Sequence, residues 1–166
     1  MTRRDLAAIV VTLAVAYGVK RHFSRAPVDD LDWILRPTAA LVSAVDGTPF
    51  VRTPGEGYVS LERHFVIAKA CAGVNFLIVA FCAPVLAFVA GTRRKALLVL
   101  GSAAAAYLAT LVANAMRIVI AVRLADGMAD ADALARERAH RVEGVVIYTL
   151  ALCLFFLAAR RAAART

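Results

Sequence analysis

The sequence has few of the residues that build metal, redox or nucleotide sites. Its three cysteines, Cys71, Cys82 and Cys153, form no C-x-x-C pair, which argues against a thioredoxin-like couple or a zinc site. It has no cluster of metal ligands and no phosphate-binding glycine loop, so we expect no metal and no cofactor. The odd number of cysteines fits a free thiol better than a disulfide framework.

Charge is also scarce, at 19% of residues, while hydrophobic residues make up 61% and the mean hydropathy is +0.71. The formal charge is +8, but the basic residues stand between apolar runs instead of gathering on one polar segment. That distribution argues against nucleic-acid binding and favours loops that meet anionic lipid. We therefore predict an all-α polytopic membrane protein, with residues 1–166 as a single membrane domain.

Four apolar runs predict about four transmembrane helices, over residues 6–22, 65–90, 96–124 and 139–159. The first run is short for a span. It also resembles a signal peptide, because a positive start precedes an A-x-A-like site at residues 14–16. We favour a retained transmembrane helix. Whether this run is retained or cleaved as a signal peptide, the next segment would lie on the outer side of the membrane.

That outer segment, residues 26–63, is the most polar part of the chain. Residues 31–45 are apolar only in patches and predict an interfacial or re-entrant helix. Residues 48–61 place β-branched and aromatic residues on both sides of a Pro-Gly turn, which predicts a small β-hairpin.

Basic residues set the expected orientation. They gather at residues 3–4, 93–95 and 160–165, where Asp5 is the only nearby acid, whereas the loop from Lys20 to Arg63 holds six basic and six acidic residues. The positive-inside bias therefore predicts that both termini lie inside.

Three polar residues share one predicted depth. Cys71, Arg117 and His140 stand 20, 21 and 20 residues from the basic inner ends of their runs. At 1.5 Å per helical residue this is about 30 Å, roughly the hydrocarbon thickness, so all three should reach the outer interface.

Together they could carry nucleophilic chemistry. A nearby cation stabilises a thiolate, so Arg117 could activate Cys71 or hold an oxyanion, and His140 could move a proton. Each also has a structural interpretation: Cys71 as a packing residue, Arg117 reaching lipid phosphate, and His140 as an interfacial polar group.

Other residues are assigned supporting roles. Asn75 and Asn114 could tie helices together, and Gly73 allows close packing. Glu143 could orient His140 or pair with a neighbouring arginine. His64 is a rival base, but it would lie about two helical turns beyond Cys71.

Three ordered motifs carry a family resemblance: Cys-Ala-Gly-x-Asn at residues 71–75, Asn-x-x-Arg-Ile at 114–118, and His-x-x-x-Gly from His140 to Gly144. In order and spacing they resemble the exosortase/archaeosortase family, over about residues 58–157. With few spans before the cysteine motif, the chain looks most like exosortase K.

The resemblance implies a bacterial inner-membrane cysteine protease or transpeptidase, with its active site near the periplasmic face. It would cleave C-terminal sorting tails of exported proteins through a thioester on Cys71 and pass them to an unknown acceptor. Arg117 would hold the negative charge and His140 would shuttle the proton.

Two other functions stay open on the residues alone. In one, the chain is a small non-enzymatic transport or assembly subunit, with Arg117 and His140 lining a polar pathway. In the other it is a thiol redox partner, which requires two of its cysteines to pair.

Overall fold

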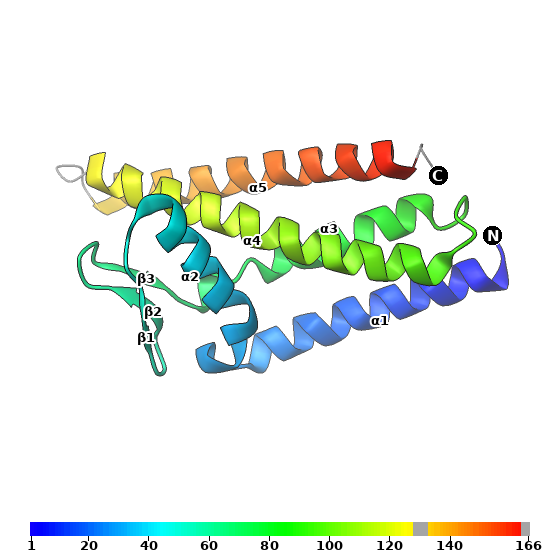
Figure 1. The fold of residues 1–166 in the computed structure, drawn as a ribbon, viewed down its shortest axis with the longest axis horizontal. Helices are drawn as coiled ribbons and strands as arrows, with labels where there is room; N and C mark the ends of the chain where they lie inside the picture. Colours follow the sequence, from blue (N-terminus) through cyan, green and yellow to red (C-terminus); the bar gives the residue numbers. More distant parts are fainter. Residues whose placement is uncertain (128–132, 164–166) are drawn as a thin grey trace. The chain divides into compact units, whose positions relative to one another are not determined.

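The computed structural model describes residues 1–127 and 133–163. For residues 125, 126, 133–137, 139 and 140 it describes the backbone alone. The chain is mostly helical, with one small sheet (Figure 1). The helices are α1 (Arg3–Arg25), α2 (Asp32–Asp46), α3 (Val74–Phe88), α4 (Lys95–Gly127) and α5 (Ala133–Ala163), with 3₁₀ turns η1 (Val28–Leu31) and η2 (Lys69–Cys71). The strands are β1 (Val51–Thr53), β2 (Gly57–Ser60) and β3 (Phe65–Ile67).

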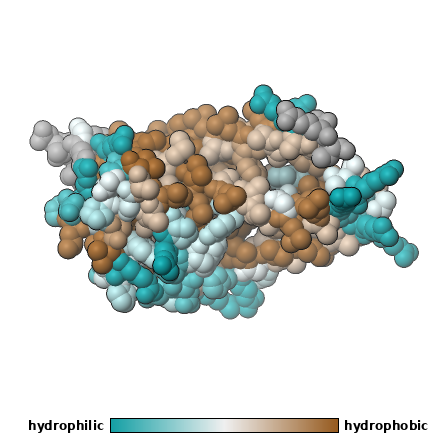
Figure 2. All heavy atoms as spheres, in the orientation of Figure 1, coloured by the Kyte–Doolittle hydropathy of each residue, from teal (hydrophilic) through white to brown (hydrophobic). Residues whose placement is uncertain are grey.

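Within the described residues, four segments are long and apolar enough to cross a membrane. They are Arg3–Arg25, Lys69–Phe88, Lys95–Leu124 and Arg141–Ala163. Many of their large apolar side chains are exposed, and Figure 2 shows broad areas of hydrophobic surface. Such surface is costly in water and suited to lipid. The predicted fold class, a multi-pass helical membrane protein, is confirmed.

The residues form two compact units. The first unit holds residues 1–25, residues 73–110 and the part of α5 from Ala151 onward. The second unit holds residues 26–72, the part of α4 from Leu111 and the part of α5 up to Leu150. Each unit is described by itself below.

In the first unit, α1 packs against α3. Thr2 and Asp5 cap the start of α1 reciprocally: the Asp5 amide donates to Thr2 Oγ1 at 3.2 Å, and the Thr2 amide donates to Asp5 Oδ2 at 2.6 Å. Asp5 is 2% exposed and pairs with Lys95 at 2.5 Å, which joins the starts of α1 and α4. Phe88 of α3 stacks on Phe156 of α5, with ring centroids 5.8 Å apart.

The second unit contains the polar outer segment. Helix α2 buries Ile34, Leu35, Thr38, Ala39 and Val42, the i, i+4 spacing of one helical face. It ends where Gly47 takes a left-handed conformation (φ 72) and its amide donates to Ser43 O at 2.9 Å. Helix α2 contacts β2, the middle strand of the sheet.

The sheet is antiparallel, in the order β1-β2-β3. Val51 pairs with Val59 across β1 and β2, and Tyr58 pairs with Ile67 across β2 and β3. Gly57 has a φ of +111, and a Cβ there would come within 2.4 Å of the Ile67 carbonyl oxygen. Only glycine therefore fits at this crossing.

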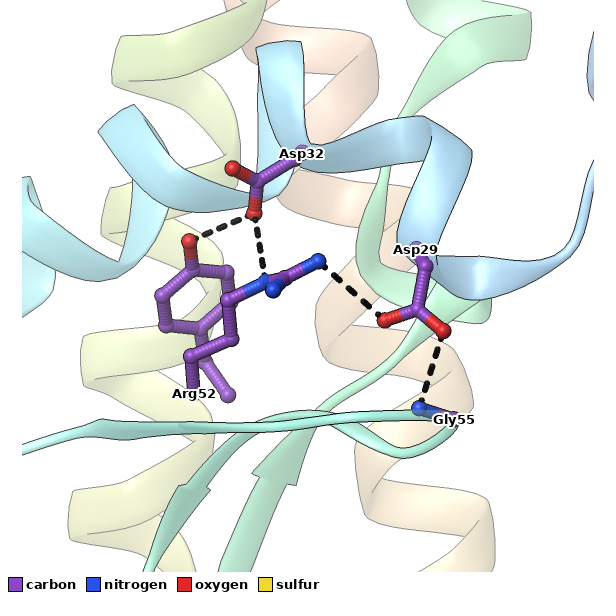
Figure 3. A network of polar contacts seen from close by, with 5 residues as sticks. Asp29, Asp32, Arg52 and Gly55 are labelled. Atoms are coloured by element: carbon purple, nitrogen blue, oxygen red, sulfur yellow. Dashed lines mark hydrogen bonds and ion pairs between the residues drawn. The ribbon is translucent and has the colours of Figure 1, made fainter.

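A polar network joins this sheet to the start of α2 (Figure 3). Arg52 reaches Asp29 at 3.3 Å and Asp32 at 3.4 Å, and the Gly55 amide donates to Asp29 Oδ2 at 3.0 Å. The Tyr58 hydroxyl donates to Asp32 Oδ1 at 2.6 Å. Burial and the nearby Asp32 carboxylate raise the pKa of Tyr58 to about 12, so the phenol stays a donor at physiological pH.

The sheet differs from the predicted hairpin by one strand. Residues 65–67, which the sequence analysis placed in the second span, form β3 because their β-branched and aromatic side chains pair with β2. The helix begins only at Val74, after Gly73 takes a left-handed conformation (φ 62).

Candidate functional site

Cys71 is the last residue of η2, not a residue of α3. Its amide donates to Ala68 O at 2.8 Å, and the Ala72 amide donates to Lys69 O at 3.1 Å. Lys69 in turn donates to the Ala26 carbonyl oxygen at 2.7 Å, which ties the turn to the beginning of the outer segment. The thiol is half-buried and is not in a disulfide.

Arg117 lies on α4 and is held against α5. Its Nη1 donates to the Tyr148 hydroxyl at 3.5 Å, and its guanidinium carbon lies 5.4 Å from the centroid of the Tyr148 ring. A Cβ at Gly144 would come within 3.0 Å of Arg117 Nε, so the guanidinium packs directly against the backbone of α5. The glycine of the His-x-x-x-Gly motif therefore makes room for the arginine of the middle motif.

The positive charge of Arg117 acts on two acidic groups. It interacts electrostatically with the Cys71 thiol and with the Glu143 carboxyl group. Glu143 is 9% exposed, and a negative charge on its carboxyl group would need a compensating charge such as that of Arg117. Cys71, Arg117 and Glu143 come from η2, α4 and α5 and all belong to the second unit.

Asn114 is 1% exposed and takes part in the same network. Its Oδ1 accepts a hydrogen bond from the Tyr148 hydroxyl at 2.6 Å. Asn114 therefore ties α4 to α5 by a side-chain hydrogen bond, the kind of link we expected of it.

His140 belongs to α5 by its backbone, but its side chain lies outside what the structure describes. Its position precedes Gly144 by four residues and Tyr148 by eight. Helical periodicity places these three positions on one face of α5, and two of them contact Arg117. The proton-shuttle role of His140 stays a prediction.

Gly73 and Asn75 belong to the first unit. Gly73 is the left-handed cap residue that begins α3. Asn75 Oδ1 accepts a hydrogen bond from Lys20 Nζ at 2.7 Å, so Asn75 ties α3 to α1. The predicted helix-tying role thus has a named partner, which the sequence analysis did not identify.

The rival base His64 lies in the turn between β2 and β3, where its φ is 49. Its proposed alignment with Cys71 required a helix that begins before residue 64, and α3 begins ten residues later, at Val74. The helical spacing argument for His64 therefore has no structural basis.

Tyr148 was missed in the sequence analysis, although it contacts both Asn114 and Arg117. A tyrosine in an apolar run is most often an interfacial or packing residue. The available signal was its spacing, since it follows Gly144 by one helical turn and so continues the His-x-x-x-Gly face.

Comparison with known proteins adds one finding. The family model of the transmembrane exosortases matches residues 33–157, a range that includes all three motifs and Tyr148. Searches of curated proteins and of solved structures returned no match to this chain.

Proposed function

This chain belongs to the transmembrane exosortase family, and from that membership and the surroundings of Arg117 we propose that it is a membrane-embedded cysteine transpeptidase or peptidase. Its substrates would be C-terminal sorting tails of exported proteins. The observation that carries the proposal is that Tyr148 and the backbone of α5 at Gly144 hold Arg117 in place, in the same unit as Cys71. We further propose that the chain belongs with exosortase K; the support is the single candidate span that precedes the span containing Cys71.

The reaction would begin at the Cys71 thiolate. The sulfur attacks the scissile carbonyl carbon, and the carbonyl oxygen becomes an oxyanion close to the guanidinium of Arg117. Collapse breaks the peptide C–N bond, leaving a thioester on Cys71. The departing amine takes the proton that His140 accepted from the thiol.

Release needs a second nucleophile. Water or an acceptor amine or hydroxyl attacks the thioester, giving up its proton to His140, and the Cys71 thiolate leaves. Glu143, Asn114 and Gly144 would support Arg117 and the local backbone without touching the substrate. Gly73 and Asn75 would support the start of α3.

We further propose that the chain lies in the bacterial inner membrane with the site near the outer face. The support is the charge asymmetry, because the basic clusters at residues 93–95 and 160–161 close apolar helices on one side. Membrane-impermeant thiol labelling of spheroplasts, with Cys82 and Cys153 replaced by Ala, measures the side directly. Labelling of Cys71 only in inverted vesicles would reverse this orientation.

The test of function is tail processing in membranes. Wild type is expected to cleave a tail-bearing reporter, and a thioester adduct should be trapped on Cys71 by hydroxylamine-sensitive labelling. Cys71→Ala should lose all processing, while the matched variants Cys82→Ala and Cys153→Ala should keep it. Full processing by Cys71→Ala would exclude the thioester mechanism. If Cys71→Ala were tolerated while Arg117→Ala was not, the transport or assembly alternative would be favoured.

A further inference from the structure

The Tyr148 hydroxyl connects two residues of the Asn-x-x-Arg motif. Its oxygen accepts from Arg117 Nη1 at 3.5 Å, and its single hydrogen is donated to Asn114 Oδ1 at 2.6 Å. A hydroxyl has only one proton to donate. Because that proton goes to the Asn114 amide oxygen, the hydroxyl oxygen faces Arg117 as an acceptor. Asn114 and Arg117, one helical turn apart on α4, are thus joined through a side chain of α5.

The Tyr148 ring restrains the same arginine a second time. The guanidinium carbon lies 5.4 Å from the ring centroid, within the range of a cation–π contact. Gly144, one turn earlier on α5, lets the backbone approach Arg117 Nε closely. The long arginine side chain can adopt many rotamers, and contacts on two sides restrict that freedom before substrate arrives.

We propose that Tyr148 is a positioning residue that holds the Arg117 guanidinium in the orientation required at the Cys71 reaction centre. The assignment rests on the proposed thioester chemistry. It also explains the spacing of the middle motif: Asn114 anchors the hydroxyl of Tyr148, and Tyr148 then orients the arginine one turn later.

The test separates the ring from the hydroxyl. Tyr148→Phe keeps the ring and removes the hydrogen bonds, whereas Tyr148→Leu removes both. Because the hydroxyl contacts both Asn114 and Arg117, kcat for tail cleavage should fall about tenfold in Tyr148→Phe and further in Tyr148→Leu, with KM changed less than about twofold. The matched control is Tyr17→Phe on α1, where the tyrosine is 66% exposed. Its kcat should equal that of wild type.

A purely structural role is excluded by combining variants. If Tyr148 acts through Arg117, Tyr148→Phe should have little further effect in an Arg117→Lys background. Effects that multiply in the double variant, or a kcat per folded molecule equal to wild type in Tyr148→Phe, would overturn the proposal.

A second experiment tests the same proposal without a substrate. The rate of Cys71 alkylation is measured from pH 6 to 9 with Cys82 and Cys153 replaced by Ala. Tyr148→Phe should slow it at neutral pH in the same direction as Arg117→Lys, and an unchanged profile would count against the role of Tyr148. If wild type cleaved no tail, the proposed function would fail, but a slowed profile would still support the link from Tyr148 to Arg117.

Discussion

Replacement of Gly144 by alanine should separate activity from stability. The added Cβ would lie 3.0 Å from Arg117 Nε, 3.5 Å from Cζ and 3.6 Å from Nη2. The first distance is shorter than an ordinary van der Waals contact, so the guanidinium must move by a few tenths of an ångström. The move is resisted because Tyr148 holds the arginine from another side.

The two effects have opposite signs. Alanine in a helix interior is favoured over glycine by about 1 kcal/mol, which opposes the cost of moving the guanidinium, so the unfolding temperature of Gly144→Ala should stay close to that of wild type. Catalysis is more sensitive, since a 1 Å displacement can cost about 100-fold. A displacement of a few tenths should therefore lower kcat by about three- to tenfold, provided that Arg117 serves the reaction.

The assay pairs kcat for tail cleavage with thermal unfolding in the same detergent. Gly101→Ala is the matched control, because Gly101 lies within α4 and a Cβ there would meet nothing within 4 Å. It should gain the same helix stability and keep full activity. Full activity in Gly144→Ala would refute the argument that the position of Arg117 against α5 matters.

The remaining predictions concern the ion pairs that hold each unit. Asp46 is nearly buried, and its pKa is lowered by the hydrogen bond from Thr48 and the contact with Arg123 at 3.0 Å. A lowered folded-state pKa gives stability that is present above the unfolded value, about pH 4, and is lost as pH falls below it. The thermal unfolding temperature of wild type should therefore fall below about pH 4. Asp46→Asn should be less stable at pH 7 and show a smaller loss on acidification; an equal loss would exclude Asp46 as its source. Lys95→Ala should destabilise the first unit more than Arg94→Ala, because it removes the partner of the Asp5 carboxylate, whereas Arg94 is exposed. Equal denaturation midpoints for these two variants would contradict the importance of the Asp5 pair.

The sequence predicted those features that depend on composition along the chain. Long apolar runs closed by basic residues predicted the membrane helices, since burial in lipid depends on length and hydropathy. The ordered motifs likewise predicted the family, and the transmembrane exosortase model matches residues 33–157. That Cys71 and Arg117 meet stays a prediction. These features can be predicted without knowing which faces of the helices pack against each other.

The features that sequence reasoning missed depend on pairing across space. β3 was read as the start of a helix because its apolar residues continue into an apolar run, and a strand of three residues gains its stability from its partner β2. Tyr148 was missed because its partners lie on another helix, 31 and 34 residues earlier in the chain. Neither local propensity nor hydropathy carries that information.

The short 3₁₀ turn that carries Cys71 has a dynamic consequence. Two backbone hydrogen bonds hold residues 71 and 72, and Gly73 interrupts the helical ladder before α3 begins. Opening this turn breaks those two bonds and leaves every hydrogen bond of α3 in place. The amides of Cys71 and Ala72 should therefore exchange with solvent deuterium well before those in the middle of α3. Cys71, the proposed nucleophile, can therefore follow the changing geometry of its bond to a substrate carbon while the hydrogen bonds of α3 stay formed.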